Sequence, residues 1–368
     1  MKTPRVVEIA ITSKCNLRCK YCAFFTSASD VNTDLPKEEW FEFFKELRQC
    51  SVANVTLSGG EPLYRQDIRE IIEEIVRNKM RFWIATNGTL VTEEIAEFLA
   101  STRRCGNIQI SIDGANSTSH DACRGRGKFL QTMEGIKILQ KYQLPISVRV
   151  TIHRNNYNEI EEIARLLLEE IGLSKFAINT VNNLGLGQRN AKSVQVDAHE
   201  RSLVMETLLK LNKKYNRNVV SGTPLAQFEN WLMMKSLSKS NKKPLNLPGG
   251  YLQACGQVEW AIAVRSDGII TPCSLLSHME LGKINRDSLR VIWQKHPAFN
   301  KLRERTKIPL TQFDSCKKCN YNNLCSGGGC PATAYLSTGE ENSPDTNLCL
   351  KSFLAEGGKL SSKLETQI

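Results

Sequence analysis

The stretch Cys15-Asn-Leu-Arg-Cys19-Lys-Tyr-Cys22 places three cysteines on one short segment. It follows an apolar run at residues 6–11 that has the composition of a β-strand. Three thiolates with the spacing C-x3-C-x2-C can wrap one face of a cubane iron–sulfur cluster. Because such a cluster has four irons, one iron would stay open to another molecule, unlike in the four-cysteine sites of ferredoxins.

Beyond this segment, short apolar runs alternate with helix-like patterns through the first two hundred residues. The predicted strands are residues 6–11, 54–57, 81–85, 108–112, 146–151 and 175–179. The predicted helices are residues 36–49, 67–78, 92–101, 128–142, 158–171 and 197–215. Such alternation is typical of βαβ units and a parallel sheet. It predicts an α/β fold in which six units form most of a barrel, with ligands at the carboxyl ends of the strands.

Glycine and polar residues follow three further predicted strands, in the runs Ser58-Gly59-Gly60-Glu61-Pro62, Thr86-Asn87-Gly88 and Ser111-Ile112-Asp113-Gly114. Paired glycines expose backbone amides and carbonyls, and Glu61 can accept hydrogen bonds from a ligand ammonium. Ser111 and Asp113 suit ribose hydroxyls or an amino acid, and Arg124 suits a carboxylate. Each run alone is more often a turn. Their recurrence after successive strands favours a ligand site.

The cysteine segment and the Gly-Gly-Glu-Pro run together resemble the cluster motif and the methionine-binding motif of the radical S-adenosylmethionine (SAM) superfamily. The resemblance covers roughly residues 5–180 and implies a partial (β/α)6 TIM-like barrel. It implies a [4Fe-4S] cluster on Cys15, Cys19 and Cys22 whose open iron binds SAM. An electron from the cluster would cleave SAM to methionine and a 5′-deoxyadenosyl radical, which abstracts hydrogen from a substrate.

The same resemblance implies which residues contact SAM. Gly59, Gly60 and Glu61 would hold the methionine ammonium. Ser111 and Arg124 would face its carboxylate or the ribose. The predicted SAM contacts are Tyr21, Gly59, Gly60, Glu61, Asn87, Ser111, Asp113 and Arg124.

Seven more cysteines lie in the second half of the chain, in the pattern C-x12-G-x4-C at Cys255 and Cys273, then C-x2-C-x5-C-x4-C, then a final cysteine. A zinc ribbon is one interpretation, because C-x2-C pairs bind zinc readily, but a four-cysteine site would leave three of the seven unexplained. The series instead resembles the SPASM extension of radical SAM enzymes, which carries two auxiliary iron–sulfur clusters.

By that resemblance, the first auxiliary cluster is held by Cys255, Cys273 and Cys330, and the second by Cys316, Cys319, Cys325 and Cys349. The last gap of the central run is x4 where the family usually shows x3, and the glycines at 327–329 could absorb the extra residue as a bulge. The first set offers only three thiolates. We therefore expect one of its irons to be held by another side chain, by water or by a substrate thiolate.

The number of cysteines and the net charge indicate the cellular compartment and the kind of partner to expect. Thirteen cysteines without a visible signal peptide indicate metal or redox chemistry in the reducing cytoplasm. Cys50, Cys105 and Cys123 are expected to be buried or half-buried small hydrophobes, and His120 to be structural. If ten thiolates hold three clusters, the net charge falls from +11 to about +7. This excess suits an anionic cofactor, an acidic peptide or simple solubility, and neither a nucleic-acid motif nor a membrane-spanning run accompanies it.

The chain is predicted to divide into a radical SAM partial barrel (1–215), a bridging region (216–250), an auxiliary-cluster domain (251–350) and a polar tail (351–368). Residues 235–250 are rich in Lys, Ser, Pro and Gly and are predicted to be a linker. Residues from 355 onward are polar and are expected to be frayed.

Enzymes with the SPASM extension mostly modify peptides or proteins. The resemblance therefore implies a maturase that installs a cross-link, a thioether, or an epimerised or otherwise oxidised residue in a ribosomally made peptide. The alternatives are sulfatase maturation, tetrapyrrole side-chain chemistry and, from another class, a non-catalytic electron carrier or scaffold. Ser274 stands where sulfatase-maturing enzymes place an acidic residue, and the intact Gly-Gly-Glu-Pro run argues against a carrier.

The expected partners are a peptide or protein substrate and an electron donor such as flavodoxin or ferredoxin. Too few residues precede Val6 to form a separate leader-binding domain. Recognition of a peptide would therefore use the barrel, the linker or a partner protein.

Overall fold

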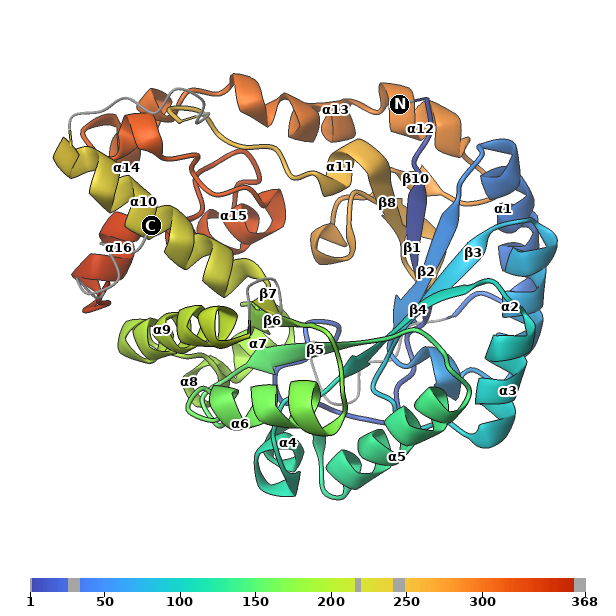
Figure 1. The fold of residues 1–368 in the computed structure, drawn as a ribbon. Coiled ribbons are helices and arrows are strands. Elements are labelled where there is room, and N and C mark those ends of the chain that lie inside the picture. Colours follow the sequence, from blue (N-terminus) through green and yellow to red (C-terminus); the bar gives the residue numbers. More distant parts are fainter. Residues whose placement is uncertain (1, 26–33, 216–219, 241–248, 361–368) are drawn as a thin grey trace.

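The computed structural model describes residues 2–25, 34–215, 220–240 and 249–360. They contain one ten-stranded sheet in the order β10-β9-β8-β1-β2-β3-β4-β5-β6-β7 (Figure 1). The strands are β1 (Val6–Thr12), β2 (Asn54–Gly59), β3 (Arg81–Thr86), β4 (Cys105–Ser111), β5 (Ile146–Ile152), β6 (Phe176–Thr180), β7 (Val220–Ser221), β8 (Ala261–Val264), β9 (Ile269–Thr271) and β10 (Gly282–Lys283).

The first seven strands pair in parallel, each with its successor in the chain. β8 pairs in parallel with the other side of β1, and β9 and β10 continue the sheet in antiparallel pairing. Because β6 pairs with β7 rather than with β1 in the part of the chain that the structure describes, the barrel stays open. The predicted partial barrel is confirmed.

Helices follow the strands and cover the outer face of the curved sheet (Figure 1). In the barrel half they are α1 (Lys37–Gln49), α2 (Ile68–Arg77), α3 (Glu93–Ser101), α4 (Ser117–Arg124), α5 (Lys128–Lys141), α6 (Ile160–Arg165), α7 (Leu186–Arg189), α8 (Ala191–Val194) and α9 (Ala198–Lys214). The remaining helices are α10 (Thr223–Ser240), α11 (Gln257–Trp260), α12 (Leu289–Lys295), α13 (Pro297–Arg303), α14 (Asp314–Lys317), α15 (Pro331–Thr338) and α16 (Leu350–Ala355). The six predicted strands and six predicted helices are all present, and a π-helical turn at Leu166–Glu170 extends α6.

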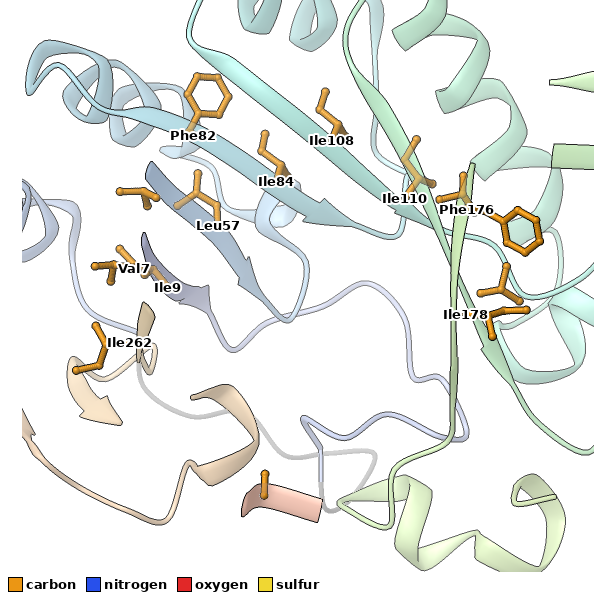
Figure 2. Close-up of a cluster of buried hydrophobic side chains, with 14 of the residues drawn as sticks. Val7, Ile9, Leu57, Phe82, Ile84, Ile108, Ile110, Phe176, Ile178 and Ile262 are labelled. Atoms are coloured by element: carbon orange, nitrogen blue, oxygen red, sulfur yellow. The ribbon is translucent and has the colours of Figure 1, made fainter. Parts of the chain in front are cut away.

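The core lies between the sheet and these helices. On β1, Val7 and Ile9 are fully buried on the outer face, while Glu8 between them faces the barrel interior. Figure 2 shows Val7 and Ile9 beside the apolar side chains of the neighbouring strands, including Leu57 and Ile84. The alternation of side chains along each strand therefore sends apolar residues outward to the helices and leaves the barrel interior to polar ones.

The predicted linker is wrong in its first part, because α10 continues to Ser240. Phe228, Trp231 and Leu232 of α10 are buried, and the Trp231 ring packs 4.6 Å from that of Phe353 on α16. This packing stabilises the helix despite its lysine- and serine-rich end. Residues 241–248 of the predicted linker lie outside the described residues.

The polar tail also begins differently from the prediction. Residues 350–355 form α16, and Leu360 is buried. The Lys359 N–H donates a hydrogen bond to Ser202 Oγ on α9 (2.8 Å). The chain therefore packs against the barrel half up to residue 360. No helix in the described ranges has both the length and the apolar character needed to span a membrane.

Candidate active site

A cavity of about 490 Å³, here called the barrel cavity, lies at the carboxyl ends of the first strands. Cys15, Cys19 and Cys22 line it on the side of the loop after β1. Ser274 and Leu275, which follow β9, line it on the side of the predicted auxiliary-cluster region. One cavity thus joins the radical-cluster motif to the second half of the chain.

Backbone contacts from distant segments hold the cysteine loop. The Lys20 N–H donates to the Cys123 carbonyl (3.0 Å), and the Leu186 N–H donates to the Cys22 carbonyl (2.9 Å). Gly185 has φ +57°, and a Cβ at this position would lie 2.7 Å from the Cys22 carbonyl oxygen. The loop conformation is therefore imposed by the α4 segment and by the segment that follows β6.

The donor chemistry of this loop fits an iron–sulfur cluster. Burial raises the pKa of Cys15 to about 11 and that of Cys19 to about 12, and it also raises the pKa of Cys22. The charge of Cys22 adds to the shift at the other two thiols, because the three sulfurs lie near one another. Buried soft thiolates need a bound cation to stay deprotonated, which iron supplies.

A single metal ion would need a different arrangement. Among the described residues, no three His, Cys, Asp or Glu side chains are grouped as ligands of one ion. A cubane cluster instead needs thiolates at separate corners.

The paired glycines allow β2 to end directly against the cysteine loop. A Cβ at Gly59, whose φ is +121°, would lie 2.3 Å from the Thr12 carbonyl oxygen, and one at Gly60 would lie 2.1 Å from that of Lys14. The Gly60 N–H donates to Thr12 O (2.8 Å), and the Glu61 N–H donates to Lys14 O (2.9 Å). Any other residue would push these two loops apart, so the backbone cradle requires glycine.

Glu61 ties the end of β2 to the end of β3. Its carboxylate accepts hydrogen bonds from Thr86 Oγ1 (2.6 Å), the Asn87 N–H (2.7 Å) and the Leu63 N–H (3.1 Å). Burial raises the pKa of Glu61, and these bonds oppose the shift. The side chain lines the barrel cavity, as predicted, but three of its acceptor positions serve the protein itself.

Asp113 lies behind the cavity wall, where it holds two residues that line the cavity. It accepts hydrogen bonds from Arg124 Nε, the Tyr21 hydroxyl and the Thr151 N–H. Burial alone would raise the pKa of Asp113, but the Arg124 guanidinium holds it below its ordinary value. The prediction of Asp113 as a SAM contact needs correction, because its carboxylate is fully buried and does not reach the cavity. Asp113 is a positioning residue for Arg124 and Tyr21.

The other predicted SAM contacts all line the barrel cavity: Tyr21, Gly59, Gly60, Glu61, Asn87, Ser111 and Arg124. Asn87 Nδ2 also donates to Asn16 Oδ1 in the cysteine loop (2.9 Å). Tertiary structure thus brings residues from four strand ends to one wall.

Two buried histidines complete the support beneath this wall. The His153 ring stacks on Tyr21 with centroids 5.7 Å apart, and His120 Nδ1 accepts from the Asp113 N–H (3.2 Å). Burial lowers the pKa of both histidines, that of His120 to about 4. The structural role expected for His120 agrees with this placement. His153 escaped the sequence analysis, although its position directly after β5 could have revealed it.

Cys330 lies close enough to Cys255 and Cys273 for its charge to act on both. Burial raises the pKa of Cys255 and brings that of Cys273 to about 12, and the charge of Cys330 adds to both shifts. The buried Arg305 guanidinium lies within the field of Cys255 and Cys330, and its Nη1 has no hydrogen-bond partner among the described residues. The other nitrogens of Arg305 donate to Gln253 O and Ser343 O. A buried cation beside two thiols, with one N–H group left without an acceptor in the described part of the chain, fits an anionic metal cluster.

In the second auxiliary set, burial and the nearby charges of Cys316, Cys349 and Cys319 together raise the pKa of Cys325 to about 11. The extra residue in the gap before Cys330 is accommodated by glycines in the left-handed region, at φ +64° for residue 327 and +81° for residue 328. Both glycines thus adopt a conformation that other residues rarely take, which is compatible with the bulge expected there.

Of the three cysteines outside these sets, Cys50 and Cys123 are buried and Cys105 at the start of β4 is half-buried, which agrees with the expectation. Glu8, Gln109 and Arg149 also line the barrel cavity, and sequence analysis missed them. Each of the three stands between apolar residues on its strand, and this alternation could have predicted that its side chain faces the barrel interior.

Family models match the amino-acid sequence in both halves of the chain. The model of the radical SAM superfamily matches residues 9–167, and that of the SPASM iron–sulfur cluster-binding domain matches residues 255–320. The chain belongs to the radical SAM superfamily. Cys325, Cys330 and Cys349 lie beyond the SPASM match, so their assignment rests on the structure and the spacing.

Relatives of this radical SAM enzyme differ in their named roles. The AdoMet-dependent heme synthase of Methanosarcina barkeri is 29% identical over 92% of this chain and 94% of its own. The subtilosin biosynthesis protein AlbA of Bacillus subtilis is 26% identical over 89% of this chain and 67% of its own. The fold is similar to that of Streptococcus suis SuiB bound to its precursor peptide SuiA, with a TM-score of 0.71, 16% identity, and 95% and 76% of the two chains covered.

SAM and iron–sulfur clusters are the cofactors of this radical SAM enzyme. When bound, the reduced cluster would supply the electron and SAM would accept it, being cleaved to methionine and a 5′-deoxyadenosyl radical. The chain's own residues would bind and shield the reacting groups: the glycine cradle and Glu61 shape one wall, Arg124 and Tyr21 are fixed by Asp113, and the partly enclosed cavity reduces contact with bulk water.

Proposed function

We propose that this radical SAM enzyme abstracts hydrogen from a ribosomally made peptide and installs a cross-link, a thioether, or an epimerised or otherwise oxidised residue. The observation that carries the proposal is the barrel cavity, which reaches from Cys19 to Ser274 and Leu275 beside the first auxiliary set. A residue bound there can lose hydrogen on one side and an electron on the other. The similarity to SuiB, solved with a precursor peptide, and to AlbA supports a peptide substrate.

Three clusters are part of the proposal. Cys15, Cys19 and Cys22 hold the SAM-binding cluster. The first auxiliary cluster is on Cys255, Cys273 and Cys330, and the second is on Cys316, Cys319, Cys325 and Cys349. A flavodoxin or ferredoxin serves as electron donor.

The experiment uses anaerobically reconstituted enzyme, SAM, dithionite and short peptides encoded beside the gene, each deuterated at its carbon-bound positions, Cα included. We expect deuterium to appear in 5′-deoxyadenosine and the peptide to change mass. Turnover of SAM with no deuterium transfer from any such peptide would refute the peptide proposal.

A second candidate function is tetrapyrrole side-chain chemistry. The observation in its favour is the match to the heme synthase of M. barkeri, which spans nearly the full length of both chains. A porphyrin with deuterated propionate side chains, tested in the same assay, separates the two candidates: transfer from the porphyrin alone selects this one.

A further inference from the structure

The barrel interior is hollow beyond the SAM-binding end. A second cavity of about 400 Å³, here called the lower cavity, lies at the amino ends of the strands and is lined by Trp83, Lys175 and Trp260. Glu8 on β1 and Arg149 on β5 line both cavities. These two residues therefore occupy the layer where the cavities adjoin.

Arg149 differs from the other arginines that line the barrel cavity. Arg124 is buried and ion-paired with Asp113. Arg265 pairs with Asp267 and with Glu280. Arg149 is exposed within the cavity, and its guanidinium has no hydrogen bond or ion pair among the described residues.

Burial raises the pKa of the Glu8 carboxyl and the charge of Arg149 opposes that shift, so the two groups interact without forming a direct ion pair in the described part of the chain. Glu8 is hydrogen-bonded to Ser58 Oγ (3.3 Å) and to Ser274, and it makes no ion pair within 4.0 Å in the described part of the chain. Lys175, another exposed cation, lines the adjoining lower cavity. A guanidinium fork without a hydrogen-bond partner in the described ranges, in a partly enclosed space that Lys175 also lines, is suited to bind a carboxylate.

We propose that Arg149 binds a carboxylate of the substrate and so selects acidic substrates. The inference rests on the proposed function, because it concerns the molecule that enters the barrel cavity. Arg149 is paired in register with Ser111 on β4 and lies two residues before Thr151 on β5, which places its Cα about 7 Å deeper in the barrel than that of Thr151. The carboxylate anchors the substrate from below while the reacting carbon faces the SAM end.

Two sources can supply this carboxylate: an acidic peptide side chain or the propionate of a porphyrin. The test therefore uses three probes with cluster-loaded enzyme: a short acetylated peptide with one central glutamate, its glutamine counterpart, and coproporphyrin. Binding is followed by fluorescence, with the peptides dye-labelled. The variants are Arg149→Gln, Arg149→Lys and, as a control outside the cavity, Arg165→Gln on α6.

We expect the wild type to prefer the glutamate peptide over the glutamine peptide by about tenfold or more, since a charge-assisted fork is lost with the amide. Arg149→Gln should abolish this preference, Arg149→Lys should retain part of it, and Arg165→Gln should keep it. Phenylglyoxal should label Arg149, and the bound glutamate peptide should protect it. Iron content and SAM binding by dialysis report whether each variant is folded.

The outcomes separate this inference from the function. Tight coproporphyrin binding that Arg149→Gln abolishes supports the carboxylate site but overturns the peptide proposal. Equal binding of the two peptides by the wild type, with no effect of Arg149→Gln on any probe, overturns the inference and leaves the peptide proposal standing. Failure of the wild type to bind either carboxylate probe also overturns the inference.

Discussion

The two cysteine-rich regions of the chain are built in opposite ways. In the loop after β1, three cysteines lie within eight residues, and the ends of β2, α4 and β6 hold that loop through backbone hydrogen bonds. In the second half, seven cysteines spread from Cys255 to Cys349 over short elements such as α14 and α15, which have four and eight residues. The sheet therefore shapes the first region.

The second region has little regular structure of its own to fix its cysteines. Helices this short are marginal without tertiary packing. Metal binding then contributes directly to folding, as it does in small metal-organised domains. We therefore expect the loop after β1 to keep its conformation when iron is removed, and the second cysteine-rich region to unfold.

The largest expected effect comes from removing iron. Chelation under anaerobic conditions should expose the amides of residues 310–350 to hydrogen exchange while β1–β6 stay protected, because only the former depend on clusters for their fold. Hydrogen–deuterium exchange with mass spectrometry measures both regions in one sample. Equal protection of both regions in the iron-free protein would break the comparison.

A single cysteine from each region provides a matched pair. Cys19→Ala should produce no 5′-deoxyadenosine from SAM and dithionite yet keep the fold and about eight of twelve irons, since two cubes remain. Cys325→Ala should lose the iron of one auxiliary cluster and lower the urea midpoint of unfolding. Wild-type 5′-deoxyadenosine production by Cys19→Ala would contradict its assignment as a ligand.

The buried ion pair between Asp113 and Arg124, behind the wall of the barrel cavity, should contribute most to the stability of this end of the barrel. Asp113→Asn leaves the Arg124 charge buried without its partner, at a cost of about 3–5 kcal/mol. Urea denaturation of the cluster-loaded protein measures the change. As a control, Glu170→Gln removes the exposed pair with Arg165 and should cost less than about 1 kcal/mol. Similar losses in the two variants would show that burial of the pair has no special weight.

Protonation of His120 should produce a smaller, pH-dependent effect. Its pKa is lowered to about 4 in the folded state by burial, so the unfolded chain binds the extra proton first as the pH falls. Stability from this group is present above about pH 6.5 and is lost between about 6.5 and 4, by about 3 kcal/mol at most. His120→Gln should therefore show a smaller fall of the urea midpoint across this range than the wild type.

The exposed His199 provides the control for this measurement. His199→Gln should follow the wild type from pH 6.5 to 4. Identical pH profiles for His120→Gln and the wild type would show that His120 does not carry the effect.

The local sequence pattern was sufficient to predict most of the strands and helices of the barrel. Apolar alternation located the six predicted strands, and glycine runs at their ends marked the wall of the cavity. The sequence pattern gave a wrong prediction at the end of α10, because this lysine- and serine-rich segment has the composition of a linker. In the structure it is helical, and Trp231 of the same helix packs against Phe353. Helix stability there comes from a contact 122 residues away in the sequence, which no local window contains.

The sequence by itself determined which chemistry the chain can carry: three closely spaced thiols on a strand end, a glycine pair beside them and a second series of cysteines. Only the tertiary structure decided which polar residues line the cavity and which lie behind its wall. It placed Asp113 behind the wall and Arg149 inside it, although both are charged residues at inward positions. The physical reason is that a buried charge needs a partner within reach, and whether Arg124 at the end of α4 reaches Asp113 or a cation stays unpaired depends on the packing of the whole barrel.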